Sequence, residues 1–372
     1  MTTESGLRVG QEVDVEVGKV AHGGHFVARH EGQVLFVRHA LPGELVKAKI
    51  TRTRKRHAFA DAVTILRAAP ERVVAPCKYA GPGGCGGCDF QHVELETQRA
   101  FKQQVIEEQL QRLAGIDLRV PVVAIPGDEA GLRWRTRMRY VELPDGGRGL
   151  RQYHSHQVVE IDDCLIARSD AREPTKGTVR ETVTHDDVKH EFRVDGRGFW
   201  QVHRGAPTAL VAAVIEGAQP KPGETCWDLY AGVGLFSAFM ADAVGLDGLV
   251  VSVEQDATAS RHARANLVGL PQVSVHCGST RTVLARGLPA PDVVVLDPPR
   301  SGAGREVVDL VCAARPRIVV LVACDPAAFA RDASYFNTHG YLLERAQGMD
   351  LFPMTHHVEC VALLTRAGSD LR

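Results

Sequence analysis

Hydrophobic and polar residues alternate with a period of two near the start of the chain. Apolar runs at 13–17, 34–37 and 45–50 are separated by glycine and proline turns at Gly23-Gly24 and Pro42-Gly43. Short strands at this spacing are typical of a small barrel of the oligonucleotide-binding type. We therefore predict an all-β unit over residues 1–68.

A second pattern begins near residue 196, where continuous apolar runs alternate with helix-like segments. These runs lie at 227–230, 249–253, 293–296 and 318–322. Continuous runs of this length suit buried strands of a mostly parallel sheet that is covered on both faces. The pattern predicts an α/β fold for this part of the chain.

The middle of the chain is less regular. A linker at 68–76 leads to a cysteine-rich stretch, and one apolar face predicts a packing helix from about Val93 to Leu113. Short strand-like pieces fill 120–195. We predict three domains: the barrel (1–68), a central domain (69–92 and 117–195) and an α/β domain (93–116 and 196–372).

Composition narrows the class of protein. The chain has 372 residues, of which 44% are hydrophobic and 24% charged, as in globular proteins that need no disulfides. No apolar run approaches the ~20 residues of a membrane span, and residues 1–5 lack the features of a signal peptide. Nine cysteines without a secretion signal favour the cytoplasm and thiols that bind metal or act as nucleophiles.

Positive charge is concentrated in two runs, although the net charge is only −1. The segment 45–60 contains no acid and six cations: Lys47, Lys49, Arg52, Arg54, Lys55 and Arg56. A second run has Arg133, Arg135, Arg137 and Arg139. Either run alone could be a solvated face. Two runs in a neutral chain favour a phosphate-binding surface, and therefore a nucleic acid as partner.

The segment 228–235, DLYAGVGL, joins a predicted strand to a helix through a glycine-bearing turn. Glu254 ends the next strand, where a carboxylate can accept hydrogen bonds from ribose hydroxyls. A structural turn is one alternative. A dinucleotide site is disfavoured because Ser237 replaces the third glycine of that motif. A site for S-adenosylmethionine fits best. Asp297 precedes two prolines at another strand end, which is either a place where ligands bind in open α/β sheets or a simple Asx/Pro turn.

Two further residues have candidate chemistry. Cys324 follows an apolar strand and is either a nucleophile or an inert buried thiol. Glu359 interrupts an apolar segment and is either paired structurally or tuned as an acid or base.

Motifs along nearly the whole chain resemble the RNA uracil-5-methyltransferase family, in particular its members with a TRAM domain and an iron–sulfur cluster. The motifs are AHGG at 21–24, ALPGE at 40–44, the cysteine-rich stretch, GFWQV at 198–202, DLYAG at 228–232, DPPR at 297–300, CDP at 324–326, ARD at 330–332, FP at 352–353 and HVE at 357–359.

The resemblance implies a Rossmann-like class I methyltransferase domain, an N-terminal TRAM barrel and a central β-rich iron–sulfur domain. It implies that S-adenosylmethionine is bound by Gln201, Tyr230, Glu254 and Asp297. It also implies that Cys324 is the nucleophile and Glu359 the base in methylation of a uridine at carbon 5. Structured RNA is the expected partner, 23S ribosomal RNA first and the tRNA T-loop as the alternative, for an enzyme that acts as a monomer.

This chain departs from the family at two positions. His203 and Asp325 stand where the family usually has asparagine. Because Asp325 places a negative charge beside a thiol that must ionise, it bears on the tuning of Cys324.

Four cysteines, Cys77, Cys85, Cys88 and Cys164, form a candidate metal site. Their spacing alone favours structural zinc, whereas the resemblance implies a four-iron, four-sulfur cluster. Two other classes of protein remain as rivals: a non-catalytic RNA-binding protein with a zinc knuckle, and a dinucleotide-dependent oxidoreductase.

Overall fold

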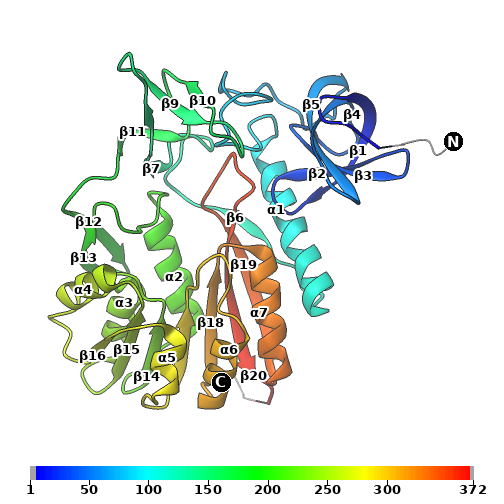
Figure 1. Ribbon diagram of the computed structural model, residues 1–372. Helices are drawn as coiled ribbons and strands as arrows, with labels where there is room; N and C mark the ends of the chain where they lie inside the picture. Colours follow the sequence, from blue (N-terminus) through cyan, green and yellow to red (C-terminus); the bar gives the residue numbers. More distant parts are fainter. Residues whose placement is uncertain (1–5, 369–372) are drawn as a thin grey trace. The chain divides into compact units, whose positions relative to one another are not determined.

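The computed structural model describes residues 6–368. The prediction that a signal peptide is absent was made from residues 1–5, which lie outside this range. The chain packs as two compact units (Figure 1). We call them the barrel unit, with residues 6–105, 128–173 and 352–357, and the sheet unit, with residues 106–127, 174–351 and 358–368. Among the described residues, no helix is both long and apolar enough to cross a membrane.

The barrel predicted from the alternating pattern is present. Its strands close in the order β1-β2-β3-β5-β4. They are β1 (Glu12–Ala21), β2 (His25–His30), β3 (Gln33–Arg38), β4 (Leu45–Thr53) and β5 (His57–Arg67). Every second side chain points inward, so that Val15, Phe26, Leu35 and Ile50 form a buried core. The outward side chains are therefore free of any role in that core.

The helix α1 (Leu95–Gln109) begins close to its predicted position and continues into a π-helical turn, Leu110–Ala114. Gly115, with φ of 67°, ends it in the left-handed conformation. Phe101 and Val105 complete the core of the barrel unit, whereas Leu110 belongs to the core of the sheet unit. This confirms the interpretation of a packing helix.

The barrel unit also contains short strands that follow the cysteine-rich stretch. They are β7 (Arg135–Arg137), which pairs with β11 (Ala167–Arg172), and the sheet of β8 (Val141–Glu142), β9 (Arg148–Arg151) and β10 (Val158–Glu160). These elements surround the cysteines.

An eight-stranded sheet forms the second unit, in the order β16-β15-β14-β17-β18-β20-β19-β6. The four strands predicted from continuous apolar runs are β14 (Thr225–Leu229), β15 (Leu249–Glu254), β17 (Val293–Leu296) and β18 (Ile318–Ala323). They pair in parallel with their neighbours among β14 to β18. The sheet is completed by β6 (Val122–Ala124), β16 (Val273–Cys277), β19 (Tyr341–Asp350) and β20 (Glu359–Arg366).

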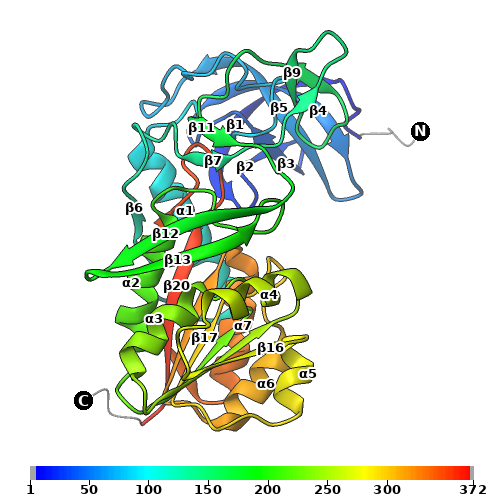
Figure 2. The same ribbon diagram turned by 90° about the vertical axis from the view of Figure 1, so that its left-hand side faces the viewer.

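Helices cover both faces of this sheet (Figure 2). On one side lie α2 (Ala206–Ala218) and α3 (Leu235–Val244), and on the other α5 (Thr280–Ala285), α6 (Arg305–Ala314) and α7 (Pro326–Thr338). The helix α4 (Ala257–Asn266) packs on β15, β16 and the hairpin of β12 (Thr178–His185) and β13 (Val188–Asp195). The α/β fold expected for this part of the chain is confirmed.

Candidate active site

The carboxyl ends of four neighbouring parallel strands meet at one edge of the sheet. Tyr230 follows β14, Glu254 ends β15, Asp297 follows β17 and Cys324 follows β18. Because these strands are adjacent in the order β15-β14-β17-β18, the sheet brings four of the predicted site residues to one edge. Gln201 is half-buried in the segment between β13 and α2, so its place at this site stays a prediction.

Glu359 reaches the same edge because β20 runs antiparallel to β18. Ala323 pairs with Cys360 in this ladder, so Cys324 and Glu359 occupy the next step of the same register. Cys324 directly follows the last residue of β18, and Glu359 is the first residue of the neighbouring β20. The two predicted catalytic residues are therefore adjacent in the sheet, although their roles stay predictions.

The Glu359 carboxyl is buried, with 4% of the residue exposed, and its Oε1 has no hydrogen-bond partner among the described residues. Burial raises its pKa well above the ordinary value, and the charge of Asp297 raises it further while Arg300 lowers it. Burial also raises the pKa of the Cys324 thiol to about 12, with Glu359 and Asp297 as the main charges acting in the same direction. Without a bound cation, both groups therefore favour their protonated forms.

The glycine-bearing turn after β14 has the geometry of a ligand-binding loop. Tyr230 has φ of 65°, which is uncommon for a residue other than glycine and often marks a functional site. Gly234 has φ of 90°, and a Cβ there would lie 2.7 Å from the Cδ1 atom of Leu267. Position 234 therefore has no room for a side chain, and the backbone of the turn stays accessible at the edge of the sheet.

Ser237, which replaces the third glycine of the dinucleotide motif, has a structural role. Its hydroxyl donates a hydrogen bond of 2.5 Å to Oδ2 of the buried Asp228. Glu254 is held in a similar way, because its two carboxylate oxygens accept hydrogen bonds from the backbone nitrogens of Gly232 (2.8 Å) and Asp256 (2.6 Å). The carboxylates of Asp228 and Glu254 are therefore fixed in place beside the turn.

Negative charge is crowded at this edge. Burial raises the pKa of Asp228 to about 6, against the bond from Ser237. Burial, together with the charges of Asp228 and Glu254, raises the pKa of Asp297 to about 7. Such an arrangement suits a cationic ligand, and S-adenosylmethionine carries a sulfonium and an ammonium group.

The two departures from the family pattern both lie at helix starts. Asp325 caps α7, and its Oδ1 accepts a hydrogen bond of 2.8 Å from the backbone nitrogen of Ala328. The main charges that raise the Cys324 pKa are instead Glu359 and Asp297. His203 is buried before α2, and its Nδ1 accepts a hydrogen bond of 3.1 Å from the nitrogen of Gly205.

Sequence reasoning assigned no role to two residues that shape this edge. Arg300, within the DPPR motif, lowers the pKa values of both Cys324 and Glu359. The buried carboxylate of Asp332, on α7, accepts hydrogen bonds from the backbone nitrogens of Ala303 (2.7 Å) and Gly304 (3.1 Å). Asp332 therefore positions the loop that follows DPPR, and its place in the ARD motif was the available signal.

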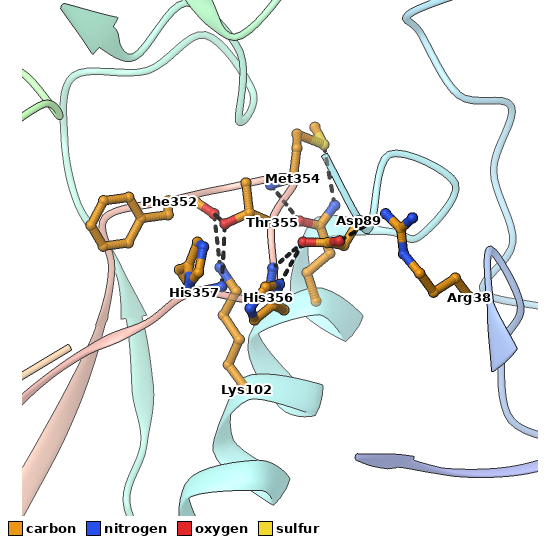
Figure 3. Close-up of polar contacts among 9 residues, drawn as sticks. Arg38, Asp89, Lys102, Phe352, Met354, Thr355, His356 and His357 are labelled. Atoms are coloured by element: carbon orange, nitrogen blue, oxygen red, sulfur yellow. Dashed lines mark hydrogen bonds and ion pairs between the residues drawn. The ribbon is translucent and has the colours of Figure 1, made fainter. Parts of the chain in front are cut away.

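The segment 352–357, which precedes Glu359 in the chain, is held within the barrel unit (Figure 3). Asp89 is its central partner, accepting hydrogen bonds from the backbone nitrogen (3.1 Å) and Nδ1 (2.6 Å) of His356. Arg38 donates to the other oxygen of Asp89 at 3.1 Å. Burial alone would raise the pKa of Asp89, but His356 and Arg38 hold it well below its usual range.

The four predicted metal ligands line one cavity of about 250 Å³ in the barrel unit. Gln91 connects two of them, because its Nε2 donates to the sulfur of Cys88 at 3.2 Å and its Oε1 accepts from the nitrogen of Cys77 at 3.0 Å. In the part of the chain that the structure describes, no three cysteine, histidine or acidic side chains are grouped as a single metal ion requires. The cavity nevertheless presents four thiols, a donor set that fits an iron–sulfur cluster.

Two arginines of the second run, Arg133 and Arg135, are engaged by neighbouring groups, and a phosphate-binding surface formed by this run stays a prediction. Arg133 makes an ion pair with Asp163 and also donates to backbone oxygens of Cys164 and Ala167. Arg135 lines the cysteine cavity, and burial lowers its pKa. Arg135 therefore borders the cysteine cavity, whereas Arg133 holds the backbone around Cys164, and the charge pattern alone reveals neither contact.

The fold and the site together define a class of protein: a class I methyltransferase that uses S-adenosylmethionine, joined to a small β-barrel. Family models match two parts of the chain, one described as the TRAM domain at residues 6–63 and one described as tRNA (Uracil-5-)-methyltransferase at residues 290–367.

Relatives and a solved structure resemble the chain over nearly its whole length. Uncharacterized RNA methyltransferases of Streptomyces avermitilis and Streptomyces coelicolor are 42% and 41% identical, over 98% of this chain and 100% and 94% of theirs. The Pyrococcus abyssi tRNA (uracil-54, C5)-methyltransferase in complex with S-adenosyl-L-homocysteine has the same fold, with a TM-score of 0.71 at 21% identity, over 95% of this chain and 100% of that one.

The chain therefore belongs to the TRAM-containing family of S-adenosylmethionine-dependent RNA (uracil-5-)-methyltransferases. This membership confirms the resemblance stated from the motifs. It also excludes the two rival classes, the non-catalytic RNA-binding protein and the oxidoreductase.

We expect Asp297→Asn to stabilise the ligand-free protein while it weakens S-adenosylmethionine binding. The folded-state pKa of about 7 lies above the value of about 3.9 expected when unfolded. Ionised Asp297 thus costs stability increasingly as pH rises from about 4 to 7, so the gain in melting temperature should be larger at pH 8 than at pH 4.5.

The same substitution tests whether the negative charge of Asp297 contributes to binding of the cationic S-adenosylmethionine. Wild-type affinity for S-adenosylmethionine should fall as pH drops below 7, because protonation removes the negative charge of Asp297, and the variant should lose this pH dependence. Asp247→Asn, at an exposed aspartate between α3 and β15, is the control. Equal melting temperatures of wild type and Asp297→Asn at pH 8 would contradict the burial cost.

Proposed function

We propose that this enzyme methylates carbon 5 of a uridine in structured RNA through a covalent adduct between Cys324 and carbon 6 of the base. The observation that supports this most directly is the register of β18 and β20, which sets Cys324 beside Glu359, a buried carboxyl whose Oε1 has no hydrogen-bond partner among residues 6–368. A thiol and a carboxyl at one strand end are the two groups that this chemistry requires.

Carbon 5 of uracil is a poor nucleophile, so the reaction begins at carbon 6. The Cys324 thiolate forms a bond to carbon 6, and the electron pair of the 5,6 double bond becomes available at carbon 5. S-Adenosylmethionine, when bound, supplies the methyl group from its sulfonium, which takes the bonding electrons of the broken carbon–sulfur bond. Carbon 5 then carries both a methyl group and a hydrogen.

Glu359 completes the reaction by removing the proton from carbon 5. The electrons of that bond re-form the 5,6 double bond, the bond from carbon 6 to sulfur breaks, and Cys324 leaves as a thiolate. Burial favours protonation of Glu359, which suits a carboxylate that must accept a proton at this step. The target base has to leave its stack to reach the sheet edge, as in other enzymes that act on a base.

Tyr230, Glu254 and Asp297 are the residues that we propose to hold S-adenosylmethionine, together with Gln201. Glu254 ends β15 beside the turn, where it can accept hydrogen bonds from ribose hydroxyls. The buried charge of Asp297 faces the same edge as Cys324, and it raises the pKa of that thiol. A bound cation between them would lower the thiol pKa and favour the thiolate.

The four cysteines Cys77, Cys85, Cys88 and Cys164 fit a four-iron, four-sulfur cluster, which we propose as their ligand. All four line one cavity, and such a cluster fills more space than the single zinc ion that is the alternative. Burial raises the pKa of each of these thiols, a cost that metal coordination would remove. The cluster would organise the barrel unit, and the methyl transfer needs no electron from it.

We propose 23S ribosomal RNA as the substrate, with the tRNA T-loop as the alternative, and a monomeric enzyme in the cytoplasm. The combination of a TRAM barrel with a cysteine cluster supports ribosomal RNA. The description of the matching family model favours tRNA. All nine cysteines are free, which is consistent with a reducing compartment.

The catalytic pair is tested by separating the first step from the last. Glu359→Gln should allow attack and methyl transfer and then stall before elimination. An RNA–protein adduct that carries the labelled methyl group should survive denaturing electrophoresis. Cys324→Ala should give neither product nor adduct, and the double variant should lose the adduct.

A matched control is Cys360→Ala, which removes the neighbouring buried thiol. In the Glu359→Gln background it should still form the adduct. Turnover of Glu359→Gln at the wild-type rate would assign the base to another group, and an adduct with Cys324→Ala would assign the nucleophile to another thiol.

The RNA target is tested by mapping 5-methyluridine in cells with and without the gene. Loss of one modified position in 23S ribosomal RNA, with tRNA unchanged, is the expected result. Loss confined to the T-loop of tRNA would establish the alternative, and no loss in either RNA would refute both.

The cysteine site is tested by purification without oxygen. We expect a brown protein with iron and acid-labile sulfide in equal amounts, and Cys88→Ser should lose both. Cys277→Ser, at an exposed cysteine of the sheet unit, should keep them. A colourless protein with one zinc ion per chain would instead support the spacing-based alternative.

A further inference from the structure

The outer surface of the barrel carries aromatic rings that its core does not explain. On β3, Leu35 and Val37 are fully buried, and Phe36 between them points outward. On β5, Ala58 and Ala60 are buried in the same way, and Phe59 points outward. Both phenylalanines remain partly exposed, and contiguous apolar side chains on a surface, unlike single ones, mark candidate binding sites.

The outward rings are arranged as one continuous surface. Phe36 and Phe59 are register partners across the parallel β3–β5 pair, and their rings stack at 30° with centroids 5.5 Å apart. His57 meets the edges of both, at 5.4 Å from Phe36 and 5.3 Å from Phe59. We call these three residues the ring surface.

A buried ring supports this surface from β2. His25 lies edge-on to Phe36 at 6.1 Å and to Phe59 at 5.4 Å. Burial and the nearby charge of Arg38 lower its pKa to about 4, so it is a neutral packing ring at physiological pH. The ring surface is thus held rigidly rather than formed by mobile side chains.

Positive charge borders the same rings. The guanidinium carbon of Arg52, an exposed residue on β4, lies 4.1 Å from the centre of the Phe59 ring. Exposed Arg54, Lys55 and Arg56 follow in the turn to β5, and 45–60 contains no acid. The one acid on this face of β5, Asp61, is paired in register with Arg38 of β3. Aromatic faces bordered by exposed cations match single-stranded RNA, whose bases stack and whose phosphates are anionic.

We propose that the ring surface is a stacking site for unpaired bases of the substrate RNA, separate from the pocket for the target uridine. Bases stack on Phe36, His57 and the Arg52-covered Phe59, while the cations of the β4–β5 turn contact phosphates. The proposal deepens the proposed function and rests on it for the identity of the RNA. It makes the barrel a reader of single-stranded parts of the substrate RNA, rather than a general electrostatic anchor.

The test replaces the rings and keeps apolar volume, in the full-length protein. Phe36→Leu with Phe59→Leu should weaken binding of the substrate RNA about tenfold or more, since each stacked base contributes at least severalfold. The slope of affinity against salt should not change, because no phosphate contact is lost. Arg54→Gln with Lys55→Gln should instead flatten the slope of affinity against salt, because phosphate contacts are lost. Phe36→Tyr with Phe59→Tyr should retain wild-type affinity.

Location is tested with 5-iodouridine placed in the unpaired parts of the RNA. Irradiation should crosslink it to Phe36, His57 or Phe59, and the leucine variant should lose this crosslink. At saturating RNA, the leucine variant should keep the wild-type kcat and raise only KM. Unchanged affinity and KM in that variant, or an altered salt slope, would overturn the stacking site.

The outcomes separate this inference from the proposed function. If the wild type forms no 5-methyluridine yet the leucine variant still weakens RNA binding, the stacking site stands and the methylation proposal fails. If methylation proceeds and the leucine variant binds and reacts as the wild type does, only the stacking site fails. A surface that instead binds a protein would give leucine variants with unchanged RNA affinity.

Discussion

The antiparallel pairing of β20 with β18 is the constraint that brings Glu359 to the same edge of the sheet as Cys324. Parallel strands bring only their carboxyl ends to this edge, so Cys324 arrives at the end of β18. Glu359 is the first residue of β20, and only a reversed strand places a first residue at the same edge. A slip of one residue in the register would turn the carboxyl to the opposite face of the sheet. The neighbouring pairing of Met349 with Glu359 holds that register from the β19 side as well.

Carboxylates at this edge destabilise the ligand-free protein when they are ionised, and they differ in the number of hydrogen bonds that they accept. Asp228 accepts a hydrogen bond from the hydroxyl of Ser237, and Glu254 accepts hydrogen bonds from two backbone nitrogens. Asp297 and Glu359 have strongly raised pKa values, and Oε1 of Glu359 lacks a partner among residues 6–368. Asp228 and Glu254 lie at the turn, although Oδ1 of Asp228 also lacks a hydrogen-bond partner among the described residues, whereas Asp297 and Glu359 are the main charges acting on Cys324. Destabilised groups of this kind are typical of positions where function, rather than folding, sets the residue.

Local pattern predicted the elements whose signal is local. The barrel and the four parallel strands follow from period-two alternation and continuous apolar runs. The strand β19 was not predicted because its sequence, YLLERAQGMD, mixes charged and apolar residues without a regular period. Partners distant in sequence were also beyond the pattern. Nothing near Arg133 in the sequence indicates Asp163 as its partner, so the charge pattern could not reveal this ion pair. The family motifs, in contrast, located Cys324 and Glu359 because their order along the chain is informative even when each is weak.

Within the barrel unit, the cysteine-rich stretch is hydrogen-bonded to the segment 352–357. Asp89 directly follows Cys88, and its carboxylate binds both the backbone and the ring of His356 (Figure 3). The backbone nitrogens of Asp89 and Phe90 both donate to the oxygen of Met354, and Gln98 and Lys102 bind the same segment from α1. Only His357 and Val358 then separate His356 from Glu359. Because these bonds are buried and charge-assisted, breaking one would leave an uncompensated group, so the segment tolerates little movement. A group bound to Cys88 would therefore act, through the neighbouring Asp89, on the segment 352–357 of the barrel unit.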